Sequence, residues 1–185
     1  MKRDIRPDEL IDVAYLLAGR GSGPGRPRTI RLRRAISSAY YGLFHELVDW
    51  ATWKVVREDA RRNAERWAMA RWYQHADVRR VCDWVVAAAG HARGLPPGVA
   101  ALLGDSSTSV PVPAELVDVA DAFRKLHEAR QRADYDHQFG VTKVDTMMLV
   151  DAAATAIDTW RAMPDCYHSD IFLTLLGGPR PAKNG

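Results

Sequence analysis

The sequence contains few cysteines, and the two that are present lie far apart. Cys82 and Cys166 show no CxxC spacing and have no cluster of cysteine and histidine around them. A disulfide framework and a zinc site both need such spacings, so neither is expected. We predict two reduced thiols, and we predict no metal and no cofactor.

Long apolar runs are also missing. No stretch approaches the roughly 18 apolar residues that a membrane-spanning helix needs. The first ten residues, MKRDIRPDEL, are rich in charge and hold no apolar run of the kind found in a secretory signal. These absences favour a soluble protein that stays in the cytoplasm.

A third absence is that of strand patterns. Alternation of apolar and polar residues does not occur over any useful length, and no internal repeat is visible. Apolar residues make up 47% of the 185 residues and charged residues 26%, an ordinary balance for a globular protein. Because the apolar residues recur at helical spacing, we predict an all-α fold. The simplest form is an antiparallel bundle of four to five helices in a single domain.

Apolar residues at three- and four-residue steps mark the expected helices of the first half. The first helix begins at Pro7 and ends before residues 19–28, a basic loop rich in glycine and proline. The second helix covers about residues 29–57 and contains no proline. After a short break, a third helical stretch covers about residues 63–89.

The second half begins with an irregular segment, residues 95–113, in which VAALL is expected to form at most one helical turn. A fourth helix starts near residue 113. Thr142 and Asp145 then resemble a capping box for a fifth helix. This layout predicts two parts: a helical domain, residues 1–163, and a C-terminal extension with a disordered tail, residues 164–185.

The charge of the chain is only mildly basic. A formal net charge of +3 and a pI near 9.0 permit an RNA partner without requiring one. Arg31 and Arg34 lie at the start of the second helix, where helix N–H groups also favour anions. They are candidate contacts for RNA or phosphate, with a solvated basic loop as the alternative. Trp67, Trp72 and Tyr73 also lie among arginines, and we interpret them as core residues rather than an RNA-stacking surface.

The apolar stripe of the fourth helix becomes polar without changing direction. At about 100° per residue, one face carries in order Leu116, Phe123, His127, Arg130, Asp134 and His137. Arg132 falls about 160° from the centre of this face, so it should be solvated. We keep Arg132 as a candidate RNA contact.

Two interpretations of this polar face remain open. An inward-facing arginine stays charged and needs a carboxylate, a phosphate or a path to water. Asp134 lies one turn after Arg130, so an ion pair that fixes packing is the first interpretation. The second is a site for phosphate and proton transfer. An imidazole can accept a proton from a ribose 2′-hydroxyl, which is the role open to His137, while Arg130 stabilises charge on the phosphate.

Two stretches of the sequence resemble the HEPN superfamily, named for higher eukaryotes and prokaryotes nucleotide-binding. RRAISSAYYGLFHEL, residues 33–47, looks like the Ala-Tyr-Tyr-x-x-Phe-His helix of its bacterial branch. HEARQRADYDHQFGVT, residues 127–142, is similar to the Arg-x-x-Ala-Asp-Tyr-Asp segment of the same branch. Both stretches occur in the order and at the separation that the family shows.

The resemblance implies a bundle of four or five helices that often forms a homodimer with the site at the dimer interface. In active members, an arginine and a histidine separated by four to six residues cleave RNA without a metal. Here Arg132 has four residues between it and His137, and Arg130 has six. Helical periodicity favours Arg130, which lies within about 20° of His137, whereas Arg132 lies roughly 140° away. We therefore expect Arg130, Asp134 and His137 to be the catalytic residues.

Two functions are consistent with this resemblance. The first is a metal-independent endoribonuclease or toxin-like effector that acts on RNA through an arginine and histidine pair at a dimer interface. An antitoxin or a nucleotidyltransferase would be the expected partner that restrains it. The alternative is a non-catalytic HEPN module that dimerises and binds a nucleotide or a protein partner.

Overall fold

The computed structural model describes residues 6–20, 28–56, 63–90, 94–104 and 111–178. Within these ranges the chain forms eight helices and no strand, which confirms the predicted all-α fold. The chain divides into two compact units: unit 1, Met1–Glu46 with Asp121–Met163, and unit 2, Leu47–Ala120 with Pro164–Gly185. No described helix is both long and apolar enough to span a membrane.

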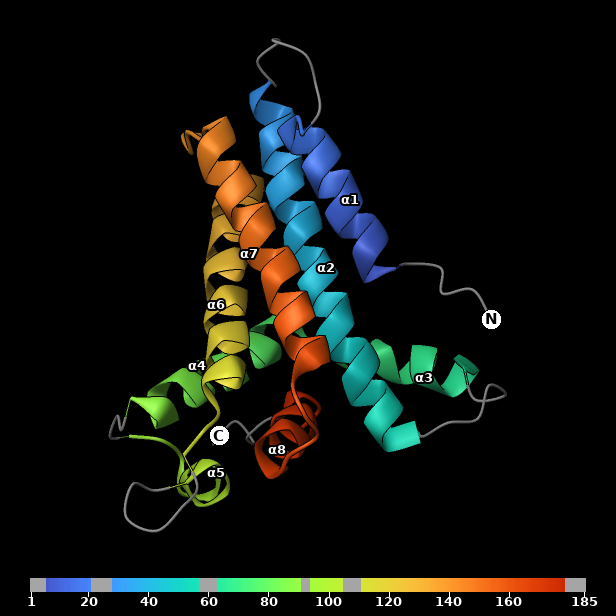
Figure 1. The fold of residues 1–185 in the computed structure, drawn as a ribbon, viewed down its shortest axis with the longest axis vertical. Coiled ribbons are helices and arrows are strands. Elements are labelled where there is room, and N and C mark those ends of the chain that lie inside the picture. Colours follow the sequence, from blue (N-terminus) through green and yellow to red (C-terminus); the bar gives the residue numbers. More distant parts are fainter. Residues whose placement is uncertain (1–5, 21–27, 57–62, 91–93, 105–110, 179–185) are drawn as a thin grey trace, which may run out of the picture. The chain divides into compact units, whose positions relative to one another are not determined.

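Unit 1 is built from four helices. It contains α1 (Pro7–Ala18), the first part of α2 (Thr29–Val56), the later part of α6 (Ala114–Tyr135) and α7 (Lys143–Ala162). Figure 1 shows these helices lying lengthwise beside one another, with the chain direction reversing from each helix to the next. This is the antiparallel bundle that the sequence predicts.

The core of unit 1 lies between these four helices. Its largest fully buried side chains include Ile36, Tyr40, Leu43, Phe123, Leu126 and Ile157. The Tyr40 and Phe123 rings join α2 to α6, with centroids 5.4 Å apart. Helix α1 approaches α2 closely because residue 42 is a glycine, and a Cβ atom there would lie 3.0 Å from Cδ1 of Ile11. A residue with a Cβ atom at position 42 would require the Ile11 side chain to shift.

Three helices of unit 1 begin at the residues that the sequence predicts. Pro7 is the first residue of α1, and Gly19, with a φ of 86°, ends it. Helix α2 begins at Thr29. Thr142 caps α7, since its Oγ1 accepts a hydrogen bond from the backbone N–H of Asp145 at 3.1 Å.

Unit 2 contains the end of α2, the start of α6 and four shorter helices. These are α3 (Asn63–Ala70), α4 (His75–Ala89), α5 (Pro97–Leu103) and α8 (Tyr167–Leu176). Helix α8 contacts both α4 and α5. Unit 2 is therefore also helical, and its four complete helices are 7 to 15 residues long.

Unit 2 differs from the prediction in three places. The stretch 63–89 is two helices rather than one, because the chain turns at residues 71–74, where Tyr73 is buried. VAALL belongs to a helix of seven residues rather than to a single turn. The C-terminal extension contains α8, which the sequence analysis missed. Residues 179–185 of the predicted tail and 21–27 of the predicted loop lie outside the described residues.

Candidate functional site

Arg130 and Asp134 meet on α6, as the sequence predicts. Their Nε and Oδ2 atoms are 2.7 Å apart, and the two side chains are only 15% and 16% exposed. Nε makes no hydrogen bond, so this contact is an ion pair rather than a hydrogen bond. Arg130 also donates a hydrogen bond from Nη2 to the Tyr41 hydroxyl oxygen on α2, at 3.0 Å.

Aromatic rings surround the Arg130 guanidinium. Its central carbon lies 5.5–5.9 Å from the ring centroids of Tyr40, Tyr41 and Tyr135. A cation at this distance is attracted to the faces of such rings. Burial alone would lower the pKa of Arg130, but Tyr41 and Asp134 outweigh it and raise the pKa above its usual value. Arg130 is a permanently charged group held by several partners.

Residues of α2 also contact the carboxylate of Asp134. The Ser37 hydroxyl donates a hydrogen bond to Oδ1 of Asp134 at 2.7 Å, and Ser37 is buried. Arg34 lies at the edge of this contact, with its Nη1 4.0 Å from the same oxygen and its side chain 67% exposed. The Arg130 and Asp134 pair therefore links α6 to α2.

His137 is not on this face, which overturns the predicted geometry. Helix α6 ends at Tyr135, and His137 lies in the following turn with its side chain exposed. Among the described residues, no hydrogen bond or ion pair is recorded for the imidazole of His137. The periodicity that placed His137 within about 20° of Arg130 holds only while the helix continues. The expected catalytic residues therefore separate into a partnered pair and an exposed histidine.

The end of α6 has an identifiable local cause. Oδ1 of Asp136 accepts a hydrogen bond from the backbone N–H of Gln138 at 2.8 Å, which is the geometry of an Asx turn. The backbone N–H of Phe139 closes the turn on the carbonyl oxygen of Asp136 at 3.2 Å. An aspartate side chain that binds nearby N–H groups competes with helix continuation.

Arg33 contributes to the same turn and was not predicted as a site residue. From α2 it donates hydrogen bonds to the carbonyl oxygens of Ala133, Asp136 and Phe139, which lie at the end of α6 and in the turn. The sequence shows only a basic residue among other arginines. Its role depends on how α2 packs against α6.

Arg132 is exposed, as predicted. Its guanidinium carbon lies 4.4 Å from the centroid of the Phe139 ring. It borders a groove of about 420 Å³ between α6 and α7, whose other lining residues include Lys125, Glu128, Phe139 and Asp145. Within the described ranges, no ion pair joins Arg132 to a carboxylate. Arg132 is therefore the arginine of this segment that remains accessible to an anion.

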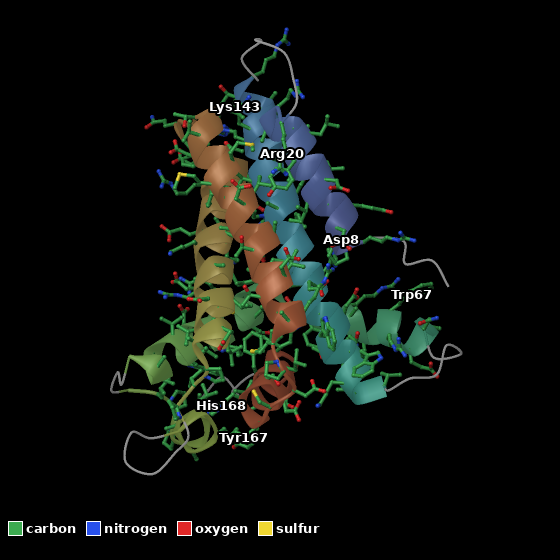
Figure 2. The ribbon with its side chains drawn as sticks, viewed as in Figure 1. Asp8, Arg20, Trp67, Lys143, Tyr167 and His168 are labelled. Carbon is green, nitrogen blue, oxygen red and sulfur yellow. The ribbon has the colours of Figure 1, made fainter. Side chains whose placement is uncertain are left out.

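Arg31 lies at the end of unit 1 where α1 ends. Its Nη2 donates a hydrogen bond to the carbonyl oxygen of Leu16 at 3.1 Å. Arg20 and Lys143 lie at the same end, as Figure 2 shows, and Nζ of Lys143 donates to the carbonyl oxygen of Gly19 at 3.0 Å. Arg31 and Lys143 therefore bind carbonyl groups at the C-terminal end of α1, which favours positive charge, whereas the Arg20 guanidinium lies over the Tyr15 ring.

A second ion cluster in unit 1 was not predicted. Arg161 on α7 binds both carboxylate oxygens of Glu46, each at 2.8 Å, and also contacts Asp8 on α1 at 2.8 Å. Glu46 is buried, and its hydrogen bonds raise the pKa of Arg161 above the usual value. Figure 2 shows Asp8 at the N-terminal end of α1. Both carboxylates bind the same guanidinium, so this cluster has the form of a structural contact.

Two of the three aromatic residues that were predicted to lie in the core, Trp67 and Trp72, are exposed. Tyr73 is buried, but Trp72 is 76% exposed and Trp67 is 45% exposed. These two indole side chains are surface residues rather than core residues. Figure 2 shows Trp67 on α3.

The described part of the chain holds no metal-binding cluster, and the comparisons with known proteins gave no match. No group of three or more histidine, cysteine, aspartate or glutamate side chains within the described ranges is arranged to hold a metal ion. No protein family model matches the sequence, and no curated protein or solved structure matches the chain.

Proposed function

We propose that this chain is a HEPN-type, metal-independent endoribonuclease whose reactive groups lie at the C-terminal end of α6 and in the exposed turn after it. The observation that carries the proposal is the accessibility of His137 and Arg132, while Arg130 and Asp134 are already matched by each other and by α2. The resemblance of residues 33–47 and 127–142 to the HEPN superfamily supports the choice of RNA as substrate.

Arg132 replaces Arg130 as the proposed phosphate contact. The motif allows four intervening residues, which is the spacing between Arg132 and His137. Helical periodicity would place Arg130 beside His137 only if α6 continued to residue 137, but α6 ends at Tyr135. Arg130 and Asp134 then serve to hold α6 against α2.

The proposed reaction is an intramolecular transesterification. The imidazole of His137 accepts the proton of a ribose 2′-hydroxyl, whose oxygen attacks the adjacent phosphorus. The bond from phosphorus to the 5′-oxygen breaks, that oxygen takes up a proton from water as it leaves, and the imidazole later releases its proton to water. Arg132 stabilises the charge on the non-bridging phosphate oxygens. The products are a 2′,3′-cyclic phosphate and a free 5′-hydroxyl.

A second copy of the chain would complete this site. The turn after α6 is exposed and offers only one wall to a substrate, so we propose a homodimer with the two turns facing each other. An antitoxin or a nucleotidyltransferase is the proposed partner that restrains cleavage. Light scattering of the purified chain tests the dimer, and a monomer at micromolar concentration would contradict it.

One observation favours the alternative function. No described residue orients the imidazole of His137, although catalytic histidines usually have such a partner. A non-catalytic HEPN module that binds a nucleotide or a protein would need no oriented histidine. The two functions differ in whether RNA is cut.

The deciding experiment is RNA cleavage in the presence of EDTA. The proposal predicts that cleavage persists and leaves a 2′,3′-cyclic phosphate, since no step uses a metal. A substrate with a 2′-deoxy sugar at the scissile position should resist. Loss of cleavage on chelation would contradict the mechanism, and no cleavage of any RNA by the dimer would favour the non-catalytic module.

A further inference from the structure

Arg33 reaches across from α2 to the turn that carries His137. Its Nη1 donates to the carbonyl oxygen of Ala133 at 3.3 Å. Its Nη2 donates to the carbonyl oxygens of Asp136 at 2.5 Å and Phe139 at 3.0 Å. Ala133 lies in the last turn of α6, whereas Asp136 and Phe139 lie on either side of His137. One guanidinium therefore binds backbone groups before and after the histidine.

The chemistry of a helix end explains why an arginine suits this place. The last carbonyl groups of a helix have no partner within it, and a cation there also interacts favourably with the helix dipole. A guanidinium offers several N–H groups in fixed directions, which a lysine ammonium cannot reproduce. Arg33 is half-buried, so its contacts are less screened than those of the exposed neighbour Arg34.

The turn itself has few internal bonds. The N–H of Gln138 binds Oδ1 of Asp136, and the N–H of Phe139 binds the carbonyl oxygen of Asp136. This carbonyl oxygen is shared with Arg33. Without the guanidinium, the carbonyl oxygen of Asp136, which closes the turn, would lose one of its hydrogen-bond donors.

We propose that Arg33 is a positioning residue that fixes the turn 136–139 and thereby places His137 for reaction. The link to reaction rests on the proposed function, but the fixing of the turn does not. Because the imidazole has no recorded partner of its own among the described residues, its position follows the backbone of the turn.

Amide hydrogen exchange on the full-length chain tests whether Arg33 fixes the turn. In Arg33→Gln, the amides of Gln138 and Phe139 should exchange at least about tenfold faster than in the parent. Protected amides in the middle of α7 should keep their rates. Arg33→Lys should show a smaller increase, because the charge remains but the fixed directions are lost. Unchanged exchange at both amides in Arg33→Gln would overturn the proposal.

A matched control separates this contact from a loss of charge. Arg6→Gln removes one positive charge from the start of α1, where Arg6 contacts Glu9 at 3.6 Å. It should leave the amides of Gln138 and Phe139 unchanged. If Arg33→Gln loses helicity by circular dichroism, Arg33→Lys carries the same test.

Cleavage kinetics then test whether the fixed turn matters for His137. In Arg33→Gln, kcat for RNA should fall about 100-fold with KM within about threefold of the parent, since small misplacements of a reactive group have effects of this size. Faster exchange with an unchanged kcat would overturn the positioning role. A parent that cuts no RNA would refute the proposed function, and the exchange rates alone would then show whether Arg33 fixes the turn.

Discussion

The two polar groups near the end of α6 differ in how their charges are matched. Arg130 and Asp134 lie against α2, where Tyr41 and Ser37 supply further hydrogen bonds. Arg132 and His137 face solvent and have no recorded ion pair within the described residues.

The difference between these groups shows where chemistry can occur. A partially buried charge requires a partner, and once it has one it contributes mainly to structure. Exposed charges lose little by remaining unmatched and stay available to a ligand. Arg130 and Asp134, which continue the buried stripe of α6, therefore form a contact between helices. The groups available for reaction are the exposed neighbours Arg132 and His137.

Of the substitutions that test this difference, removal of His137 should have the largest effect. His137→Ala should lower kcat for RNA cleavage by about 1,000-fold, within the range for loss of a general base. Its free energy of unfolding should stay within about 0.5 kcal/mol of the parent, because the side chain is exposed. Gln138→Ala, in the same turn, is the control and should retain parental cleavage. Cleavage that survives in His137→Ala would remove the histidine from the mechanism.

Arg132→Ala should have the next largest effect. We expect cleavage to fall about 100-fold through loss of charge stabilisation at the phosphate. Stability, measured by urea unfolding, should change by less than about 0.5 kcal/mol. A variant with parental kcat and KM would show that Arg132 does not contact the substrate.

Arg130→Ala should affect stability rather than chemistry. Its removal leaves Asp134 with less compensation, and we expect the free energy of unfolding to fall by about 2 kcal/mol. Cleavage per folded molecule should stay within about threefold of the parent, unlike in Arg132→Ala. The comparison fails if Arg130→Ala is as stable as the parent but inactive, since Arg130 would then be the reactive arginine.

The smallest expected effect is a pH dependence at His45, a half-buried residue of α2. Burial lowers the pKa of His45 below its usual value of 6.5, so the folded state binds this proton less readily than the unfolded state. The contribution of His45 to stability is therefore complete above that value and decreases as the pH falls through the lowered pKa. His45→Gln should show a shallower loss of stability between about pH 7 and 5 than the parent. Identical slopes for the two proteins would contradict this assignment.

Much of unit 1 could be predicted because its signals are local. Periodicity and the cap at Thr142 located α2 and α7, and the same periodicity paired Arg130 with Asp134. The position of His137 could not be found in this way. No glycine or proline marks the end of α6. The local signal for this end is Asp136, whose side chain binds the amide of Gln138 two residues later.

Other features depend on contacts between distant residues or on weaker signals. The roles of Arg33 and of Arg161 with Glu46 follow from helix packing, and a charged residue on a single helix does not reveal them. Helix α8 was different. Phe172, Leu173 and Leu176 have helical spacing and are buried, so α8 could have been predicted from its sequence.

The order of the two units along the chain has a consequence for synthesis. Unit 1 is made from two segments of the sequence, and the segment Leu47–Ala120 of unit 2 lies between them. As the chain leaves the ribosome, α1 and α2 emerge well before the parts of α6 and α7 that cover them. Until then their apolar faces are exposed to solvent, and nascent chains in this state are prone to aggregate. A message truncated before the codon for Asp121 would therefore yield a chain that cannot bury Ile36, Tyr40 and Leu43 within unit 1.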